Sequence, residues 1–308
     1  MSIERLCIHQ SVSHVFPPNR LEAALADFGL EMVVSEDRPT DGCDVVVTFA
    51  HEDWFLETEW VHSILAGVDR YPIEAYEDAG VVLTNSTGIH GDAVGQTVAG
   101  YLLMIARDLH RYRDHQRAGE WHQHSGDEMM RLDGQEICVV GLGTLGRGIA
   151  KYAGALGMEV TGVRQSGEPV DEVETVYTPD ELHEAIEDAR FVALSVPLNE
   201  ATEKLFSTEE FEHMRTDAYL INVARGPVVD ESALIEALET EMIAGAALDV
   251  YEQEPLPPSS DLWEMEQVIM TPHVSALFPF YHESVAELVG ENLTRIDDGR
   301  DLVNQVVG

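Results

Sequence analysis

The sequence predicts an α/β protein with two domains, each built on a parallel sheet. Three observations support this. Strand-like apolar runs alternate with helix-like ones along the chain, as parallel sheets with crossover helices require. The length of 308 residues suits two domains of ordinary size, each with its own core. A glycine-rich turn, Gly141 to Gly146, stands near the middle of the chain between a strand-like and a helix-like run.

The first expected strand series lies before residue 92. Its strands are expected at residues 6–8, 45–49, 63–65 and 81–83, with a helical stretch at 20–28. A long amphipathic segment follows from residue 93 to about 119. Its apolar positions recur at helical spacing: Val94, Val98, Leu102, Ile105 and Leu109.

A second series of six strands follows this segment, and six is the number that a complete dinucleotide-binding domain needs. The strands are expected at residues 137–140, 159–163, 191–195, 218–222, 246–249 and 268–270. Residues 281–296 are expected to form a helix that leaves the domain. We therefore expect a first domain of residues 1–92 and 275–308, with residues 93–274 inserted into it. An active site would lie in the cleft between the domains, at the carboxyl ends of the strands.

The glycines at 141, 143 and 146 have the spacing of a nucleotide-binding turn. The first glycine allows a tight turn, the second lets the backbone approach a pyrophosphate, and the third lets helix pack on strand. Phosphates would then bind at the N-terminus of the following helix. The alternative is a glycine-rich βα turn in an α/β domain without a ligand. With strand before and helix after, the pattern favours a dinucleotide site.

Composition excludes several classes of protein. Apolar residues make up 44% of the chain, which argues against disorder, and no apolar run approaches the ~18–20 residues of a membrane span. The N-terminal residues lack the pattern of a secretion signal. Three cysteines, Cys7, Cys43 and Cys138, are an odd number and argue against a disulfide framework. We expect them to be small core residues in a cytoplasmic protein.

The charge is strongly negative, with 57 acidic against 18 basic residues and a net charge of −39. Only Lys151 and Lys204 are lysines, and the acids are spread along the whole chain. Such a surface would repel nucleic acid and anionic membranes, and its self-repulsion would destabilise the fold unless salt screens it. The composition resembles that of proteins from extremely halophilic archaea, so we expect a salt-rich cytosol and a requirement for molar salt.

Three late strands are each expected to end in a polar side chain suited to catalysis. Arg225 follows the strand ending at Asn222, Asp249 and Glu254 follow the next, and His273 follows the last. An arginine can bind a carboxylate through two parallel hydrogen bonds. A histidine can exchange a proton near neutrality, and a paired carboxylate fixes its tautomer. Singly, these residues could be a surface ion pair or a loop histidine; together they predict an active site.

With these motifs in place, the sequence resembles the D-isomer-specific 2-hydroxyacid dehydrogenases over essentially its whole length. The motifs that carry the resemblance are residues 65–69, 85–90, 117–121 and 195–198 with Thr202 and Leu205, and the longest, 214–230. The resemblance implies two Rossmann-like or flavodoxin-like domains, with the nucleotide domain inserted into the substrate domain. It also implies a homodimer through the nucleotide domains, with residues 121–124 near the subunit contact rather than in a metal site.

The resemblance also implies roles at the matching positions. Arg225 would bind the carboxylate and carbonyl of the substrate, His273 would be the acid/base, and Glu254 its partner. The other substrate-binding residues would be Leu65, Ala66 and Gly67, the last two through backbone N–H groups. The implied cofactor-binding residues are Gly141, Gly143, Thr144, Leu145, Gly146, Arg164, Gln165, Ser166, Val196, Pro197, Thr202, Val223, Asp249 (at the nicotinamide carboxamide) and Ser275.

The residue after the second nucleotide-domain strand indicates which cofactor is used. An NAD enzyme usually presents an acid to the ribose hydroxyls about 20 residues beyond the glycine turn. Here the strand is followed by Arg164, Gln165 and Ser166, and the first acid is Glu168. A guanidinium suits a 2′-phosphate, so we expect NADP(H) to be preferred. The alternative is that Arg164 only stacks on the adenine and NAD(H) is also accepted.

The sequence differs from the family pattern at two places. Relatives often have alanine and glutamate where this chain has Gly95-Gln96, and glycine and lysine where it has Gly134-Gln135. Neither change removes a catalytic group, and Glu254 argues against the formate-oxidising branch. We expect an NADP(H)-dependent reductase of 2-keto acids, whose pocket width would depend on how Trp54, Phe55, Leu65 and Phe278 fold around the site. The alternatives are a glyoxylate/hydroxypyruvate reductase and, from another class, a nucleotide-sensing binding protein like the family's corepressors.

Overall fold

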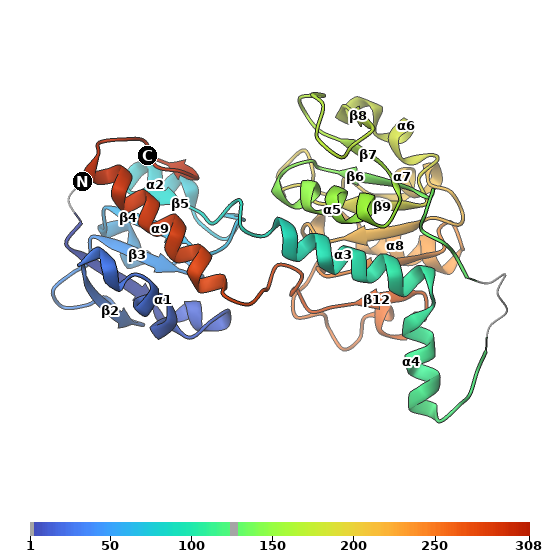
Figure 1. Ribbon diagram of the computed structural model, residues 1–308, viewed down its shortest axis with the longest axis horizontal. Coiled ribbons are helices and arrows are strands. Elements are labelled where there is room, and N and C mark those ends of the chain that lie inside the picture. Colours follow the sequence, from blue (N-terminus) through green and yellow to red (C-terminus); the bar gives the residue numbers. More distant parts are fainter. Residues whose placement is uncertain (1–2, 124–128) are drawn as a thin grey trace. The chain divides into compact units, whose positions relative to one another are not determined.

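The computed structural model describes residues 3–123 and 129–308 (Figure 1). The chain divides into two compact units, Met1–Ile89 with Leu277–Gly308, and His90–Ala276. Each unit contains one sheet with helices on both faces. Two parallel-dominated sheets confirm the expected α/β class with two Rossmann-like domains. Within the described residues, no helix combines the length and apolar character needed to cross a membrane.

The first unit has a six-stranded sheet in the order β13-β5-β4-β3-β1-β2. Its strands are β1 Arg5–His9, β2 Glu31–Ser35, β3 Val45–Thr48, β4 Trp60–Ser63, β5 Val82–Thr84 and β13 Gln305–Val307. The five parallel strands have the flavodoxin-like order 2-1-3-4-5, and β13 adds to β5 in the antiparallel sense. Helices α1 (Pro18–Ala24) and α9 (Tyr281–Asp297) pack on one face, and α2 (Ile73–Ala79) packs on the other.

Three strands of this unit differ from the expectation. β2 is half-exposed along most of its length and β13 is largely exposed, so neither gives the apolar signal of a buried strand. β4 lies at Trp60–Ser63 rather than at 63–65 because His62 is a fully buried strand residue. Its Nδ1 lies 2.8 Å from Thr84 Oγ1 and its Nε2 3.1 Å from Ser86 Oγ. These hydrogen bonds satisfy a polar ring that the apolar pattern could not anticipate.

The cysteine expectation was wrong for two residues. Cys7 and Cys43 form a disulfide with a Cα–Cα distance of 6.0 Å, whereas Cys138 is a free, buried thiol. The pairing depends on topology, because β3 lies beside β1 in the sheet and Asp44 N–H donates to Arg5 O at 3.1 Å. A sequence separation of 36 residues gave no sign of this contact.

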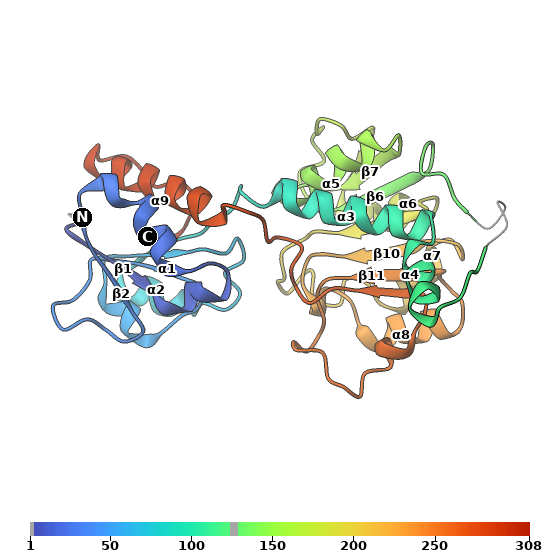
Figure 2. The same ribbon diagram turned by 60° about the horizontal axis from the view of Figure 1, so that its bottom comes forward.

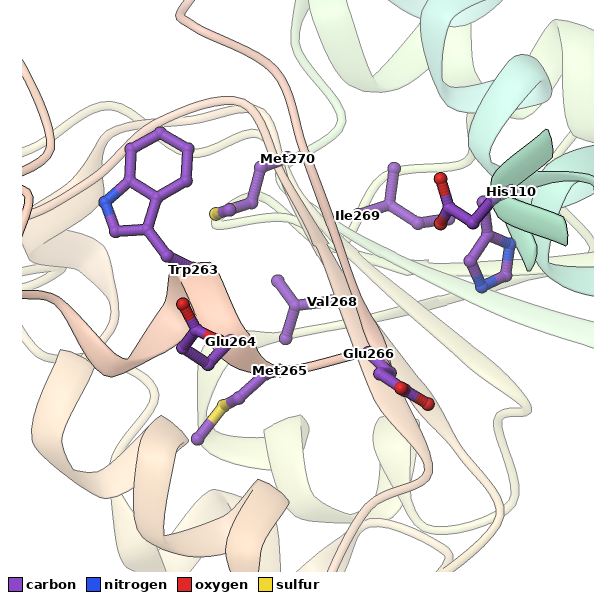
Figure 3. Close-up of a pocket in the computed structure, with 9 residues that line it drawn as sticks. His110, Trp263, Glu264, Met265, Glu266, Val268, Ile269 and Met270 are labelled. Atoms are coloured by element: carbon purple, nitrogen blue, oxygen red, sulfur yellow. The ribbon is translucent and has the colours of Figure 1, made fainter. Parts of the chain in front are cut away.

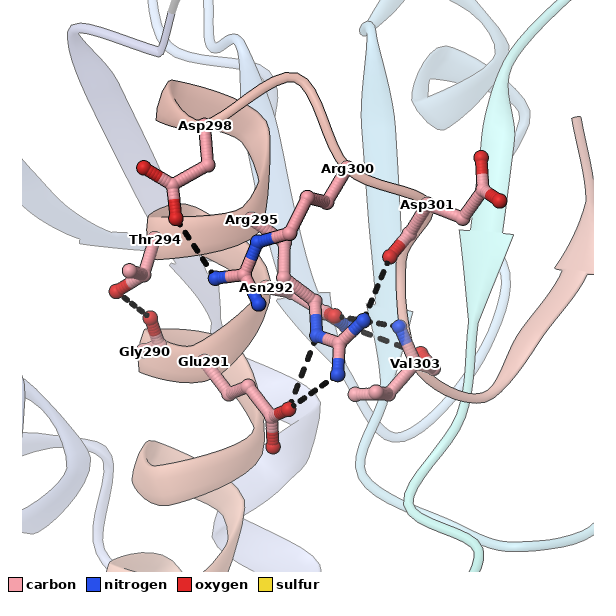
Figure 4. A network of polar contacts seen from close by, with 9 residues as sticks. All are labelled: Gly290, Glu291, Asn292, Thr294, Arg295, Asp298, Arg300, Asp301 and Val303. Carbon is pink, nitrogen blue, oxygen red and sulfur yellow. Dashed lines mark hydrogen bonds and ion pairs between the residues drawn. The ribbon is translucent and has the colours of Figure 1, made fainter.

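The C-terminal return is fixed to α9 by a polar network (Figure 4). Arg295 donates to Glu291 Oε1 at 2.9 and 2.8 Å and to Asp301 O at 3.1 Å. Asn292, which is fully buried, donates to Val303 O at 3.1 Å and accepts from Val303 N–H at 2.8 Å. These bonds direct the chain after α9 toward β5, where it adds β13 to the sheet.

The second unit has a seven-stranded sheet in the order β12-β11-β10-β9-β6-β7-β8, and its pairs are parallel. Its strands are β6 Glu136–Val140, β7 Glu159–Val163, β8 Thr175–Tyr177, β9 Phe191–Leu194, β10 Tyr219–Asn222, β11 Gly245–Leu248 and β12 Val268–Met270. Six of them have the Rossmann order 3-2-1-4-5-6, and β12 extends the sheet by one strand.

The sequence predicted six strands here, but not the six that make up the Rossmann order. The expected set includes the additional strand β12 and omits β8, which is only three residues long and lacks a fully buried residue. β8 is a strand because it pairs with β7 from Thr161 to Val163. Its place at the sheet edge supplies the sixth Rossmann position.

Helices cover both faces of this sheet. α3 (Gly91–Ala106) and α5 (Thr144–Ala155) lie on one face, and α6 (Leu182–Ile186), α7 (Thr208–His213) and α8 (Glu231–Glu239) lie on the other. Figure 2 shows α3 and α8 on opposite sides of β10 and β11. The expected long helix ends at Ala106, and α4 (Leu109–Ala118) begins after Asp108, whose φ of 55° lies in the left-handed region. That backbone conformation interrupts the helix.

Close packing of α3 on α5 explains one departure from the family pattern. A Cβ atom at Gly95 would lie 2.4 Å from Gly148 O and 2.6 Å from the ring of Tyr152, so a larger residue would push the helices apart. The neighbouring Gln96 donates from Nε2 to Tyr152 OH at 2.8 Å. Gly95 and Gln96 thus act together in a helix–helix contact.

Candidate active site

The glycine turn lies at the switch point of the second sheet, where the strand order reverses between β6 and β9. Gly141 has a φ of +98°, and a Cβ at Gly146 would lie 1.9 Å from Gly141 O. Ser195, which follows β9, donates from Oγ to Gly141 O at 2.7 Å. The turn therefore requires glycine at both positions, and Ser195 fixes its shape.

Gly143 is exposed and directly precedes α5, whose first residues are Thr144 and Leu145. No atom lies within 4 Å of the position a Cβ would take at Gly143, so the backbone there is open to a ligand. N–H groups in the first turn of a helix have no partners within the helix. This arrangement fits a pyrophosphate bound at the N-terminus of α5.

Arg164 directly follows β7, as the sequence predicted. Its backbone N–H donates to Tyr177 O at 3.0 Å, which fixes the residue beside β8, and its side chain is half-buried. Among the described residues, no carboxylate forms an ion pair with it. Gln165 and Ser166, which follow, are exposed. An unpaired guanidinium in so acidic a chain is well placed to bind an anion.

Loops after β9 and β10 contain four further candidates, Val196, Pro197, Thr202 and Val223. Thr202 donates from Oγ1 to Pro197 O at 2.5 Å and accepts from Asn199 N–H at 2.9 Å, which closes the loop that begins at Val196. Val223 is buried and donates to Leu194 O at 3.3 Å. These loops lie at the same carboxyl edge of the sheet as the glycine turn.

A tight turn after β10 positions Arg225. The buried Asn222 donates from Nδ2 to Arg225 O at 3.1 Å and accepts from Ala224 N–H at 3.0 Å. A Cβ at Gly226 would lie 1.8 Å from Tyr251 O, so only glycine fits there. The backbone of Arg225 is therefore held on both sides, and its guanidinium donates to Ala224 O at 2.8 Å.

Asp249 is fully buried and is hydrogen-bonded to the segment around His273. Its carboxylate accepts from Thr271 Oγ1 at 2.5 Å, from Val274 N–H at 2.9 Å and from Ser275 N–H at 2.9 Å. These contacts give Asp249 a structural task that the sequence did not reveal, because they depend on how two loops meet.

His273 and Glu254 form a hydrogen-bonded pair. His273 Nδ1 lies 2.7 Å from Glu254 Oε2, and Glu254 Oε1 accepts from Tyr251 N–H at 3.2 Å. The side chains are 36% and 28% exposed, so the pair is accessible to a substrate. Because Glu254 occupies Nδ1 of His273, Nε2 is the ring nitrogen that can exchange a proton with a substrate. This is the arrangement of a general acid/base.

The structure thus places the three predicted catalytic residues on loops after successive strands of the sheet: Arg225 after β10, Glu254 after β11 and His273 after β12. Leu65, Ala66 and Gly67 follow β4 in the first unit. Ser86 N–H donates to Leu65 O at 3.0 Å, and Asn85 Nδ2 donates to Ala66 O at 2.7 Å. Asn85 and Ser86 belong to the motif at residues 85–90, but the sequence did not predict that they hold this turn.

One of the residues expected near the substrate pocket is buried in the core instead. Phe55 is fully buried and packs its ring against Trp54 at 4.6 Å between centroids, so it lies in the core of the first unit. Phe278 is half-buried and stacks on Tyr281 at 4.9 Å. Of the aromatic residues proposed to set the pocket width, Phe55 is therefore excluded.

A separate pocket of about 450 Å³ lies elsewhere in the second unit (Figure 3). It is lined by His110 and Asp114 of α4 and by residues that include Trp263, Met265 and Met270, and none of the candidate catalytic residues lines it. Over the described ranges, no group of three His, Cys, Asp or Glu side chains could hold a metal ion. His124, at the end of the His-Gln-His segment, lies outside the described residues.

Comparison with known proteins decides the family. Residues 99–275, more than half of the chain, match the model of the NAD-binding domain of D-isomer specific 2-hydroxyacid dehydrogenases. The chain belongs to this family. Its members include NAD(P)-dependent oxidoreductases that act on 2-hydroxy acids or glyoxylate, and the chain is an NAD(P)-dependent oxidoreductase of this kind.

Three relatives illustrate the similarity. A glyoxylate reductase of Korarchaeum cryptofilum is 33% identical over 251 residues, which cover 78% of this chain and 74% of the relative. A family protein of Aeromonas salmonicida has a crystal structure with 30% identity and a TM-score of 0.86, covering 99% of both chains. A family member of Xanthobacter autotrophicus, crystallised with NADPH and MES, has 29% identity and a TM-score of 0.85, covering 99% of this chain and 98% of that one.

Proposed function

We propose that the protein is an NADP(H)-dependent D-2-hydroxyacid dehydrogenase that reduces 2-keto acids to D-2-hydroxy acids. The observation that carries the proposal is the His273–Glu254 pair at 2.7 Å, on loops after β12 and β11, with Arg225 on the loop after the next strand, β10. An arginine for the carboxylate and a paired histidine for the carbonyl oxygen are the groups this reaction needs.

The glycine turn fits a dinucleotide, because a Cβ at Gly146 would clash with Gly141 O and open the tight turn, and because the backbone at Gly143 is open. The cofactor contacts that we propose are the residues implied by the family: Gly141, Gly143, Thr144, Leu145, Gly146, Arg164, Gln165, Ser166, Val196, Pro197, Thr202, Val223, Asp249 and Ser275. The reduced nicotinamide supplies a hydride to the keto carbon when it is bound. Every other step depends on residues of the protein.

Arg225 binds the substrate carboxylate and carbonyl, and it orients the keto carbon. Ala66 and Gly67 donate backbone N–H groups to the carboxylate, and Leu65 contacts the substrate beside them. As the carbon–oxygen double bond becomes a single bond, His273 transfers the proton on Nε2 to the oxygen. Glu254 holds Nδ1 and compensates the charge of the imidazolium before the transfer. In the oxidising direction, His273 removes the hydroxyl proton.

Two observations support NADP(H) as the preferred cofactor. Arg164 follows β7 without an acidic partner among the described residues, and an arginine in this place suits a 2′-phosphate. The Xanthobacter family member, at 29% identity, was crystallised with NADPH. NAD(H) would be accepted less well, because it lacks the phosphate that the guanidinium binds.

The second candidate is a glyoxylate/hydroxypyruvate reductase, and the observation that favours it is the glyoxylate reductase of Korarchaeum at 33% identity. One panel separates the two: glyoxylate, hydroxypyruvate, pyruvate and longer branched 2-keto acids with each cofactor in molar salt. A preference for the two smallest polar substrates supports the second candidate. If no substrate causes NADPH oxidation although NADPH binds, a nucleotide-sensing binding role replaces both.

The acidic surface supports a salt-rich cytoplasm as the place of action, with no nucleic acid or membrane partner. We further propose a homodimer through the nucleotide domains. In this unit the apolar side chain of Trp121 is 97% exposed. The pocket of Figure 3 lies between the basic helix α4 and a segment that contains Trp263 and two acidic residues, Glu264 and Glu266. Light scattering at high salt tests this, and a monomeric mass contradicts it.

A further inference from the structure

A buried tyrosine on α3 is hydrogen-bonded to the segment that contains His273. Tyr101 is 3% exposed, and its hydroxyl contacts Thr271 Oγ1. Thr271 Oγ1 in turn donates to Asp249 Oδ1 at 2.5 Å. A threonine hydroxyl has one proton, and here the carboxylate takes it, so Tyr101 must be the donor in its own contact. The chain therefore runs from Tyr101 through Thr271 to Asp249.

A second tyrosine binds the carbonyl of the same threonine. The hydroxyl of Tyr251 lies 3.0 Å from both Leu248 O and Thr271 O, and its one proton is shared between the two carbonyls. The N–H of His273 approaches Thr271 O at 3.1 Å. Thr271 is thus held at its hydroxyl by Tyr101 and at its carbonyl by Tyr251, two residues before His273.

His273 needs this support because of its backbone conformation. Its φ is +53°, in the left-handed region that L-residues other than glycine rarely occupy. Its N–H donates to Asp249 O at 2.7 Å, and the two residues after it donate to the Asp249 carboxylate. The strained residue is therefore fixed on both sides by contacts that end at Asp249.

We propose that Tyr101 is a positioning residue for His273, acting through Thr271 and Asp249; this rests on the proposed function, in which His273 is the acid/base. Tyr101 contacts no reacting atom. Its hydroxyl sets the direction of the Thr271 proton, and Thr271 then holds Asp249 in the orientation that accepts the two N–H groups beyond His273. Burial raises the pKa of Tyr101 to about 12, so the hydroxyl remains a donor at neutral pH.

Tyr101→Phe tests this by removing one hydroxyl and leaving the ring in the core. We expect kcat for 2-keto acid reduction to fall about tenfold, the factor that one lost hydrogen bond corresponds to. KM for NADPH should change less than kcat, because Asp249 is only one of the proposed cofactor contacts. The solvent deuterium isotope effect on kcat should increase, because proton transfer from a displaced His273 becomes slower. Thr271→Val should give the same loss, and Thr271→Ser, which keeps the hydroxyl, should restore most of kcat.

The double variant Tyr101→Phe/Thr271→Val should be no slower than either single variant, because both break one chain. Tyr219→Phe is the control. Tyr219 is the first residue of β10, so it lies at the amino ends of the strands, away from the candidate active site, and its ring stacks on Phe191. An unchanged kcat in Tyr101→Phe would overturn the proposal. So would losses of kcat that add up in the double variant and parallel the decrease in melting temperature.

A measurement that does not need turnover separates this proposal from the proposed function. The ring resonances of His273 can be followed by NMR as pH changes in the wild type and in Tyr101→Phe. A displaced titration curve in the variant supports the positioning role, and coincident curves overturn it. Failure of the wild type to reduce any 2-keto acid would overturn the proposed function alone.

Discussion

His273 Nδ1 and Glu254 Oε2 lie 2.7 Å apart, although 19 residues separate them in the chain. They follow neighbouring strands, β12 and β11, and each residue has a further hydrogen bond that does not involve the other: the Glu254 carboxylate and the His273 backbone N–H each bind a main-chain group. Glu254 accepts from Tyr251 N–H, and His273 donates to Asp249 O. The pair is therefore preorganised by the sheet, which is what a proton donor of fixed direction requires.

Glu254→Gln removes the charge of the pair and keeps a hydrogen-bond acceptor for Tyr251 N–H. We expect kcat to fall by about 10²-fold, because the imidazolium of His273 loses its compensating carboxylate. The control is Glu252→Gln, an exposed carboxylate two residues away. Steady-state reduction of the best 2-keto acid measures both variants. Equal kcat for wild type and Glu254→Gln would remove Glu254 from the mechanism.

Arg164→Asp should reverse the cofactor preference. We expect wild-type kcat/KM to favour NADPH over NADH by about tenfold or more, the value of one charge-assisted hydrogen bond, and the variant to favour NADH. Arg20→Asp, an exposed residue of α1, carries the same charge change outside the nucleotide domain and serves as the control. A wild type that prefers NADH would contradict the assignment of Arg164.

His62 gives a prediction about acid stability. Complete burial lowers the pKa of His62 to about 3 from its usual 6.5, so the folded state holds it neutral. Below pH 6.5 the unfolded chain takes up a proton that the folded protein does not, and stability is lost as pH falls toward the folded pKa.

Between pH 6.5 and 5 this amounts to about 2 kcal/mol of unfolding free energy. Urea unfolding at several pH values should therefore show a steeper acid loss in the wild type than in His62→Gln, which keeps a donor and an acceptor. Parallel curves for the two proteins would mean that His62 is protonated in the fold or exposed.

The acidic surface gives a prediction about ionic strength. With 57 acidic and 18 basic residues, the folded protein is expected to lose activity and melting temperature when ionic strength falls from molar values to about 10 mM. At that ionic strength the Debye length grows to about 30 Å, so the acidic groups repel one another with little screening. Sodium and potassium chloride should restore both, whereas sucrose at equal osmolality should restore less. Full activity and an unchanged melting temperature in the dilute buffer would show that the charge is tolerated without screening.

Sequence patterns predicted the features that depend on local chemistry. The glycine turn, Arg164, Arg225 and His273 each stand next to a buried strand that the apolar pattern locates. The strands that were missed, β2, β8 and β13, are short or exposed, so their residues carry no comparable signal. They become strands by pairing with a neighbour that folding provides.

Contacts between distant segments could not be predicted. The Cys7–Cys43 disulfide depends on β1 and β3 being neighbours, and the three hydrogen bonds to Asp249 depend on how the loops after β11 and β12 meet. The left-handed conformation of His273 has no sequence signal, because histidine does not favour it as glycine does. The width of the pocket depends on how Trp54, Phe55, Leu65 and Phe278 fold, which residue spacing does not give, and the fold buries Phe55 in the core.

The most direct test of the central claim is NADPH oxidation in molar salt, with the 2-keto acid panel, by the wild type and by His273→Gln. The account predicts turnover of at least one 2-keto acid by the wild type, a D-2-hydroxy acid product, and a kcat in His273→Gln lower by about 10²-fold or more. NADPH binding by both proteins should be equal. Turnover that survives the loss of His273, or an L-configured product, would contradict the account.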